Sequence, residues 1–532
     1  MNTEKTNVLK VTFPALIKLL IGLVIMVCCL MFGLAGCALR TYKIDSMEDW
    51  EKLANEDDPL YGSVELLTDL DFSGREYLPI EIDYCNFYGN GHSLKNITFN
   101  DTLEPSKLFK GRSLDEINDL KIENITINSS IKDADVSILG PEVSDATFRN
   151  VEVSGTINAP FAYSIGGFYS SSKGGSSKFY DCTSNLTING GKVVGGFVGT
   201  AQYVVFEGCE NKTEINATEA AGGLVGKMII SQWFGATFNN CKNSATIKSQ
   251  NMAGGLLGLV YRSTVTNCEN NGAVSGAQYV GGIAGTQVDG SIKNCTNNGT
   301  VTSALSSENK FACIGGICGI QKSGEIMTCV NNGEIKNENY ISGGIIGYCL
   351  SVVAGCENKG RVVADIGAGG IIGFAGDNGK TIRVSHCINN AEVEAKNYAG
   401  GIIGIADLNA SDSEAYEKAK GAESLAGAAL NGFYGIFGIE VDSSKFEEYV
   451  FNSSNDILKQ LTKAAKLEIA YCESNNRVIA DNYAGGFIGI MLSCSVEQDE
   501  LYTNTYNGQI DCSGVRSEGF TYVNAEDIYK VN

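Results

Sequence analysis

Histidine is scarce in this chain of 532 residues, which has only His92 and His386. Neither lies in a His-Glu-x-x-His motif, the helical zinc site of many peptidases. A serine or cysteine nucleophile activated by histidine is not predicted either. No pair of Cys-x-x-Cys motifs indicates zinc. We therefore expect no catalytic, metal or cofactor-binding residues, and we predict that the protein is not an enzyme.

Proline is also rare, and its distribution is uneven. A proline inside a strand ladder removes a hydrogen bond and is largely confined to sheet edges. The region after residue 160 contains none, which favours long, uninterrupted ladders there. The prolines are Pro14, Pro59, Pro79, Pro105, Pro141 and Pro160.

Basic residues are outnumbered, 40 against 61 acidic residues, and the formal net charge is −21. Removal of residues 1–36, which contain three lysines and one glutamate, would make the remainder still more acidic. A charge of this sign argues against nucleic acid or an anionic membrane surface as a partner.

Only one stretch of the chain is long and apolar, residues 19–35, and three lysines lie within the first 18 residues. Leu34-Ala35-Gly36-Cys37 follows directly. This order is typical of a secretory signal, and the last four residues resemble a bacterial lipobox. We predict lipidation of Cys37; the alternative is an uncleaved anchor formed by residues 19–39. Both place the remainder outside the cytoplasm, on the cell surface and attached to a membrane.

What the chain has in abundance is one repeated phrase, a cysteine followed by Gly-Gly-apolar-x-Gly. Four of the steps between successive cysteines are 27 residues, and the glycine pair begins 13 residues after most of them. A period of this length marks a repeat fold. The cysteines are Cys182, Cys209, Cys241, Cys268, Cys295, Cys329, Cys356, Cys387 and Cys472, and the glycine pairs begin at Gly195, Gly222, Gly254, Gly281, Gly315, Gly343, Gly369, Gly400 and Gly485.

Within a repeat, the residue three before the cysteine is always large and apolar, and the residue six after it is always valine or isoleucine. Short β-branched segments separated by glycine and asparagine turns indicate strands. We predict an all-β fold, a single-stranded right-handed parallel β-helix (solenoid). Stacked coils place equivalent residues in columns, so the asparagine found two after most cysteines should form a ladder of amides.

The glycine pairs are predicted to form a corner that needs either positive φ or close backbone approach. The cysteines should point inward as buried free thiols. Parallel stacked side chains aim poorly at each other for disulfides, although Cys313 and Cys318 are an alternative local pair.

The predicted domains are a lipoprotein signal peptide (1–36), a tether and N-terminal cap (37–64), irregular first coils (65–160), β-helix repeats (161–406), a mainly helical insertion (407–467), and the last coils with a C-terminal cap (468–532). A short helix is expected at 46–54. The insertion is either a flap on the rod or a partner-binding element, with Phe433, Tyr434 and Phe437 as candidate contacts.

Segments such as Val280-Gly281-Gly282-Ile283-Ala284-Gly285, with Cys295-Thr296-Asn297-Asn298-Gly299-Thr300-Val301, resemble the GLUG motif. That motif occurs in bacterial surface proteins and in the non-catalytic part of IgA-specific metalloendopeptidases. The resemblance covers about residues 65–520 and implies a right-handed, pectin-lyase-like β-helix on the cell surface. Tyr88-Gly89-Asn90-Gly91-His92 is similar to the first-coil phrase of such chains, with tyrosine in place of aspartate.

Three functions remain open. The first is a non-catalytic surface lipoprotein whose rod serves adhesion or the display of a site for a host, glycan or envelope partner. The second is a polysaccharide lyase or glycosidase, which needs clustered carboxylates; Asp365 and Asp481 share one repeat position, and Glu392 and Glu394 lie nearby. The third is a plain spacer of the cell envelope.

Overall fold

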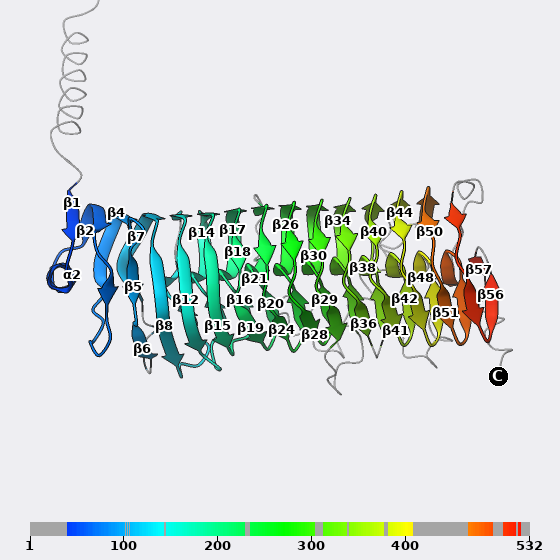
Figure 1. Ribbon diagram of the computed structural model, residues 1–532, viewed down its shortest axis with the longest axis horizontal. Coiled ribbons are helices and arrows are strands. Elements are labelled where there is room, and N and C mark those ends of the chain that lie inside the picture. The colour runs from blue at the N-terminus through cyan, green and yellow to red at the C-terminus, as the bar shows by residue number, and fades with distance from the viewer. Residues whose placement is uncertain are drawn as a thin grey trace, which may run out of the picture.

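The protein is a rod of stacked coils. The computed structural model describes residues 40–101, 103, 105, 107–142, 145–228, 235–303, 312–337, 340–376, 381–407, 467–492, 504–517 and 520–522. Figure 1 shows strands following one another along the long axis, from blue at the N-terminal end to red at the C-terminal end. The coils form three parallel sheets, called sheets A, B and C below, and sheet C begins at residue 135, after the first coils.

Sheet C shows the stacking most simply, because each coil adds one three-residue strand beside that of the coil before. The register is constant: from β16 to β52 the last residue of each strand is the first glycine of the corner, as in the pairs Gly254↔Gly281 and Gly281↔Gly315, and Ser517 follows in the final strand. The twelve strands are β9 (Asp135–Ser137), β13 (Ser164–Gly166), β16 (Val193–Gly195), β20 (Ala220–Gly222), β25 (Met252–Gly254), β29 (Tyr279–Gly281), β33 (Cys313–Gly315), β37 (Ile341–Gly343), β42 (Gly367–Gly369), β47 (Tyr398–Gly400), β52 (Tyr483–Gly485) and β56 (Val515–Ser517).

Sheet A follows the glycine corner and is formed by long strands that some coils divide into two. Its strands are β1 (Thr41–Ile44), β2 (Leu60–Leu66), β4 (Ile80–Tyr88), β7 (Phe109–Asn118), β10 (Gly140–Glu142), β11 (Thr147–Arg149), β14 (Tyr169–Tyr180), β17 (Val198–Glu207), β21 (Val225–Met228), β22 (Thr237–Asn239), β26 (Leu257–Thr266), β30 (Ala284–Lys293), β34 (Cys318–Met327), β38 (Ile346–Cys349), β39 (Val352–Ala354), β43 (Ile372–Ala375), β44 (Ile382–Ser385), β48 (Ile403–Asp407), β49 (Leu467–Ala470), β53 (Ile488–Leu492) and β57 (Phe520–Tyr522).

Sheet B begins just after the repeated cysteine, and most coils enter it twice. Its strands are β3 (Leu70–Asp71), β5 (Ser93–Lys95), β6 (Thr98–Asp101), β8 (Lys121–Ser129), β12 (Glu152–Asn158), β15 (Thr183–Asn189), β18 (Glu210–Asn211), β19 (Glu214–Ala217), β23 (Lys242–Asn243), β24 (Ile247–Ser249), β27 (Glu269–Asn270), β28 (Val274–Gly276), β31 (Thr296–Asn297), β32 (Val301–Ser303), β35 (Val330–Asn331), β36 (Ile335–Asn337), β40 (Glu357–Asn358), β41 (Val362–Ala364), β45 (Ile388–Asn389), β46 (Val393–Ala395), β50 (Glu473–Ser474), β51 (Val478–Ala480), β54 (Thr505–Tyr506) and β55 (Ile510–Cys512).

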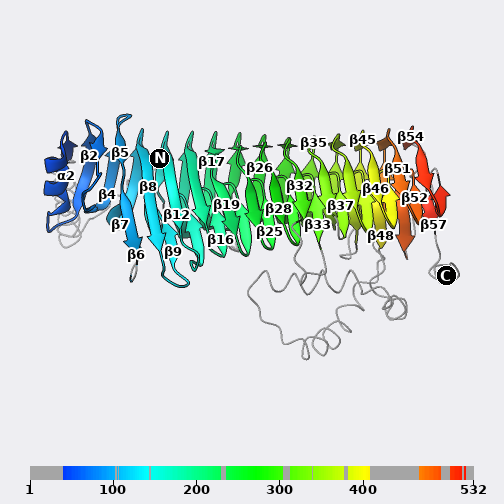
Figure 2. The same ribbon diagram turned by 60° about the horizontal axis from the view of Figure 1, so that its bottom comes forward.

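A short helix, α2 (Met47–Ala54), lies at the N-terminal end of the rod (Figure 2). Ser46 caps it by accepting a hydrogen bond from the Asp49 amide, as its sequence predicts. Trp50 is 1% exposed and donates from Nε1 to the Leu78 carbonyl oxygen at 2.9 Å. The helix therefore covers apolar surface of the first coils, which an open solenoid end would leave exposed.

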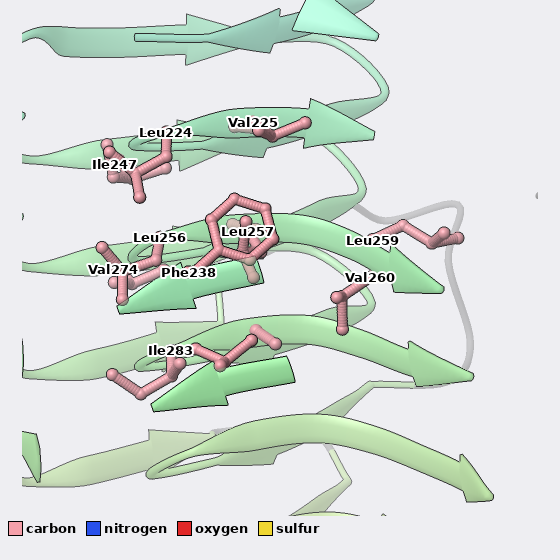
Figure 3. Packing of buried hydrophobic residues seen from close by; sticks show 14 of the residues in the cluster. Leu224, Val225, Phe238, Ile247, Leu256, Leu257, Leu259, Val260, Val274 and Ile283 are labelled. Carbon is pink, nitrogen blue, oxygen red and sulfur yellow. The ribbon is translucent and has the colours of Figure 1, made fainter. Parts of the chain in front are cut away.

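The interior of the rod is a continuous column of apolar side chains (Figure 3). The residues three before and six after each cysteine are at most 2% exposed. Equivalent residues stack directly: the rings of Phe179 and Phe206 lie 4.4 Å apart and those of Phe206 and Phe238 lie 5.4 Å apart, nearly parallel. Burial of these columns supplies most of the stabilisation, since each coil shields its apolar face only against its neighbours.

The predicted parallel β-solenoid is confirmed. Sheet A begins earlier than the domain prediction places it, because Thr41–Ile44 already pairs with Ser63–Leu66 inside the segment expected to be tether and cap. The signal or anchor helix and the body of the 407–467 insertion lie outside the described residues, whereas Asp407 and Leu467 belong to strands β48 and β49. From residue 40 onward, the described part contains no helix long and apolar enough to cross a membrane.

Candidate functional site

The asparagine column is a buried chain of amides on sheet B. In each link, Nδ2 of one asparagine donates to Oδ1 of the asparagine in the next coil, over 2.7–2.9 Å. The second Nδ2 hydrogen is donated to the carbonyl two residues on within the same coil. All members are 0% exposed, so the fully satisfied network stabilises the stack and fixes its register. The members are Asn211, Asn243, Asn270, Asn297, Asn331, Asn358 and Asn389.

The glycine corners lie against this column. A Cβ on Gly282 would meet the Gly316 carbonyl oxygen at 2.2 Å and Cγ of Asn297 at 2.3 Å. Gly282 does not have a positive φ. The corner therefore needs glycine for close backbone approach, which is the second of the two predicted reasons.

The repeated cysteines form a second buried column, and the described ones are free thiols, as predicted. Their Sγ atoms donate to backbone carbonyls, as in Cys295 to Lys293 at 3.2 Å. Burial raises the pKa of Cys182, Cys241 and Cys329 well above the usual thiol value. These three thiols are therefore neutral and shielded, which makes them poor nucleophiles and poor metal ligands. Cys313 and Cys318 are also free, so the alternative local disulfide does not form.

Three of the four carboxylates considered for polysaccharide chemistry, Asp365, Glu392 and Glu394, are engaged in ion pairs. Asp365 and Asp481 share a repeat position, but Lys396 occupies that position in the coil between them and its Nζ lies 2.8 Å from Asp365. Arg361 similarly contacts both Glu392, at 3.1 Å, and Glu394. These groups form a charge ladder on the outer face of sheet B, which is not the clustered pair of free carboxylates that a glycosidase needs.

The two histidines occupy turns. His92 follows a tight turn in which its amide donates to the Gly89 carbonyl at 2.9 Å, and its Nδ1 lies 3.2 Å from Asp69. The Lys95 ammonium, 2.8 Å from Asp69, is the main reason that the pKa of Asp69 falls to about 2. His386 is exposed. Among the described residues, no group of three His, Cys, Asp or Glu side chains could hold a metal ion.

One feature of the backbone was not predicted from the sequence, the positive φ that precedes each repeated cysteine. The residue directly before each repeated cysteine has a positive φ, between 52° and 67°, in all nine repeats. The signal was present, because six of the nine are asparagine, aspartate or glycine, which tolerate this conformation. The nine residues are Asp181, Gly208, Asn240, Asn267, Asn294, Thr328, Gly355, His386 and Tyr471.

The predicted lipidation site Cys37 and the candidate contacts Phe433, Tyr434 and Phe437 lie outside the described residues. They remain predictions.

One complete coil, from the end of β28 through the Gly281 corner and β30 to β32, matches a known family model over residues 276–302, that of the GLUG motif. The chain carries the GLUG motif. The match spans one period of the repeat, and the remaining coils share its columns. No curated protein is significantly similar to the chain in sequence.

A solved structure that resembles this GLUG-containing rod is that of a Bacteroides ovatus protein provisionally described as an immunoglobulin A1 protease. It is 16% identical, with a TM-score of 0.34, and the similarity covers 54% of this chain and 85% of that chain. At this level of similarity, no activity transfers from that protein to this chain.

Proposed function

We propose that the chain is a non-catalytic lipoprotein of the bacterial cell surface, whose β-helical rod carries a ligand-binding element away from the membrane. The observation that carries this proposal is the rod itself. Its buried asparagines and paired charged residues hydrogen-bond or form ion pairs between adjacent coils, and so they stabilise the stack. The single apolar stretch near residue 19, followed by Cys37, supports attachment at the N-terminal end.

The anchor is tested by Cys37→Ala. In cells fed a radiolabelled fatty acid, the unchanged chain is expected to incorporate label and to fractionate with membranes. The variant is expected to lose the label, because the acceptor thiol is gone. Label retained by the variant would contradict lipidation at Cys37, and residues 19–39 would then be the anchor.

The display role is tested on the segment between β48 and β49. Phe433, Tyr434 and Phe437 are proposed partner contacts, because aromatic residues are enriched at binding surfaces. Deletion of 408–466, or replacement of these three residues with alanine, is expected to reduce binding to host cells, matrix proteins or envelope fractions at least ten-fold.

The deletion joins Asp407 to Leu467, so a short glycine-serine linker is needed between the two adjacent strands. Circular dichroism of a folded β rod is the control for both variants. Binding that persists in both would exclude this segment as the display element.

A further inference from the structure

The corner between sheets A and B carries two aromatic residues, His386 and Tyr471, in the left-handed backbone region, which histidine tolerates better than tyrosine does. His386 and Tyr471 precede their cysteines with φ of 54° and 55°. Bulky side chains are disfavoured in this left-handed region, and most other repeats place asparagine, aspartate or glycine there. Strain of this kind gathers at functional sites, where it is retained for a reason other than stability.

The two side chains form a stacked pair on the surface. Their ring centroids lie 4.9 Å apart with the planes inclined by 21°. Tyr471 is 57% exposed and His386 is also exposed. The amide of His386 donates to the Ala470 carbonyl at 3.0 Å, which places the two residues in adjacent coils. The coil before them contributes Gly355 at this position, so no side chain stands beside the pair on that side.

Polar groups flank the stack on both sheets. On sheet A, Arg383 and Glu468 lie three residues before His386 and Tyr471 and form an ion pair at 2.8 Å. On sheet B, Asn475 donates to Asn390 at 2.9 Å, and Asn390 donates to Glu357 at 2.7 Å. The corner thus combines flat aromatic faces with exposed hydrogen-bond donors and acceptors on either side. Figure 1 labels strands β44 and β50 along this edge.

We propose that His386 and Tyr471 form a stacking platform for a pyranose ring of a glycan. The rings cover each other's inner faces, so the apolar C–H face of the sugar packs on the outer face of His386, beside Gly355, and its hydroxyls hydrogen-bond to the amide and charged groups nearby. The inference rests on the proposed ligand-displaying function and names its ligand class. The acidic character of the chain excludes nucleic acid as the stacking ligand.

The test is the full chain carrying both His386→Asn and Tyr471→Asn, because asparagine is the commonest residue of this column. The matched control is Thr328→Asn, a change in the same column at a position without an aromatic ring. Each protein is probed on an array of bacterial and mammalian oligosaccharides, and the strongest wild-type binder is then titrated by calorimetry.

We expect the double variant to bind at least ten-fold more weakly and to keep or raise its melting temperature, while the control binds as the wild type does. A melting temperature that falls without loss of binding would show that the stack serves stability, and would overturn the inference. Binding that survives periodate oxidation of the glycan would overturn the ligand class.

If the wild type and the double variant bind array glycans equally well, only the proposed platform at His386 and Tyr471 is overturned. A wild-type chain that binds neither array glycans nor cells overturns the platform and the proposed display function together.

Discussion

Replacement of Asn297 with alanine is expected to lower the free energy of unfolding of the central coils by about 3 kcal/mol. Asn297 is 0% exposed, accepts from Asn270 at 2.7 Å and donates to Asn331 at 2.8 Å and to the Gly299 carbonyl at 2.9 Å. Its removal leaves buried donors and acceptors without partners in the coils on both sides. Unsatisfied buried groups cost far more than the bond itself contributes.

The chain offers a closely matched control in the neighbouring residue. Asn298 also joins a ladder of amides, donating to Asn271 at 2.7 Å and accepting from Asn332 at 2.7 Å, but it is exposed. In the variant, water hydrogen-bonds to the amides that Asn298 contacted. Asn298→Ala is therefore expected to lower the free energy of unfolding by less than about 0.5 kcal/mol.

Urea denaturation followed by circular dichroism measures the two free energies, and hydrogen exchange locates the change. The Asn297 variant should exchange faster in the coils that contain Asn270 and Asn331, because each coil is stabilised mainly by its neighbours. Equal losses in the two variants would show that burial does not set the contribution of these ladders.

The columns of the rod could be predicted from the sequence because stacking translates one residue type directly onto the next coil. The asparagine two after seven of the nine cysteines, and the apolar residue three before and the valine or isoleucine six after every one, all lie where the repeat places them. Periodicity carries this information, since the coil length determines which side chains meet.

The candidate site could not be predicted in the same way. The pairing of Lys396 with Asp365, and of Arg361 with Glu392, depends on which charged residues adjacent coils contribute, and the repeat does not constrain these positions. The positive φ of His386 and Tyr471 is not evident from these two residues themselves. It is indicated only by the asparagine, aspartate and glycine residues at the equivalent positions of other repeats.

Replacement of Gly282 with alanine is expected to destabilise the rod strongly. The added Cβ would lie 2.2 Å from the Gly316 carbonyl oxygen and 2.3 Å from Cγ of Asn297, and neither is the end of a flexible side chain. To relieve these two clashes, the corner would have to move away from the next coil and from the asparagine ladder at the same time. We expect a loss of about 4 kcal/mol, at the upper end of single substitutions.

Gly276 in the same coil is the control. Its added Cβ would meet a Val280 methyl at 3.0 Å and the Asn251 carbonyl oxygen at 3.1 Å, so small shifts suffice. Ala217, Ala364 and Ala480 occupy this position in other coils, which shows that the site accepts a methyl group. Gly276→Ala should therefore change stability by less than about 1 kcal/mol, since the lower chain entropy of unfolded alanine offsets the tighter contact.

Thermal unfolding of the two variants, with hydrogen exchange over sheet C and the start of sheet A, separates these outcomes. Faster exchange in the Gly282 variant should centre on the amide of Gly282, which donates to the Gly315 carbonyl at 3.3 Å. If both variants melt with the wild type, the glycine pair is not required for close packing. The glycine pairs would then be required during folding and not in the folded state, because the folded coil would accept a side chain at its corner.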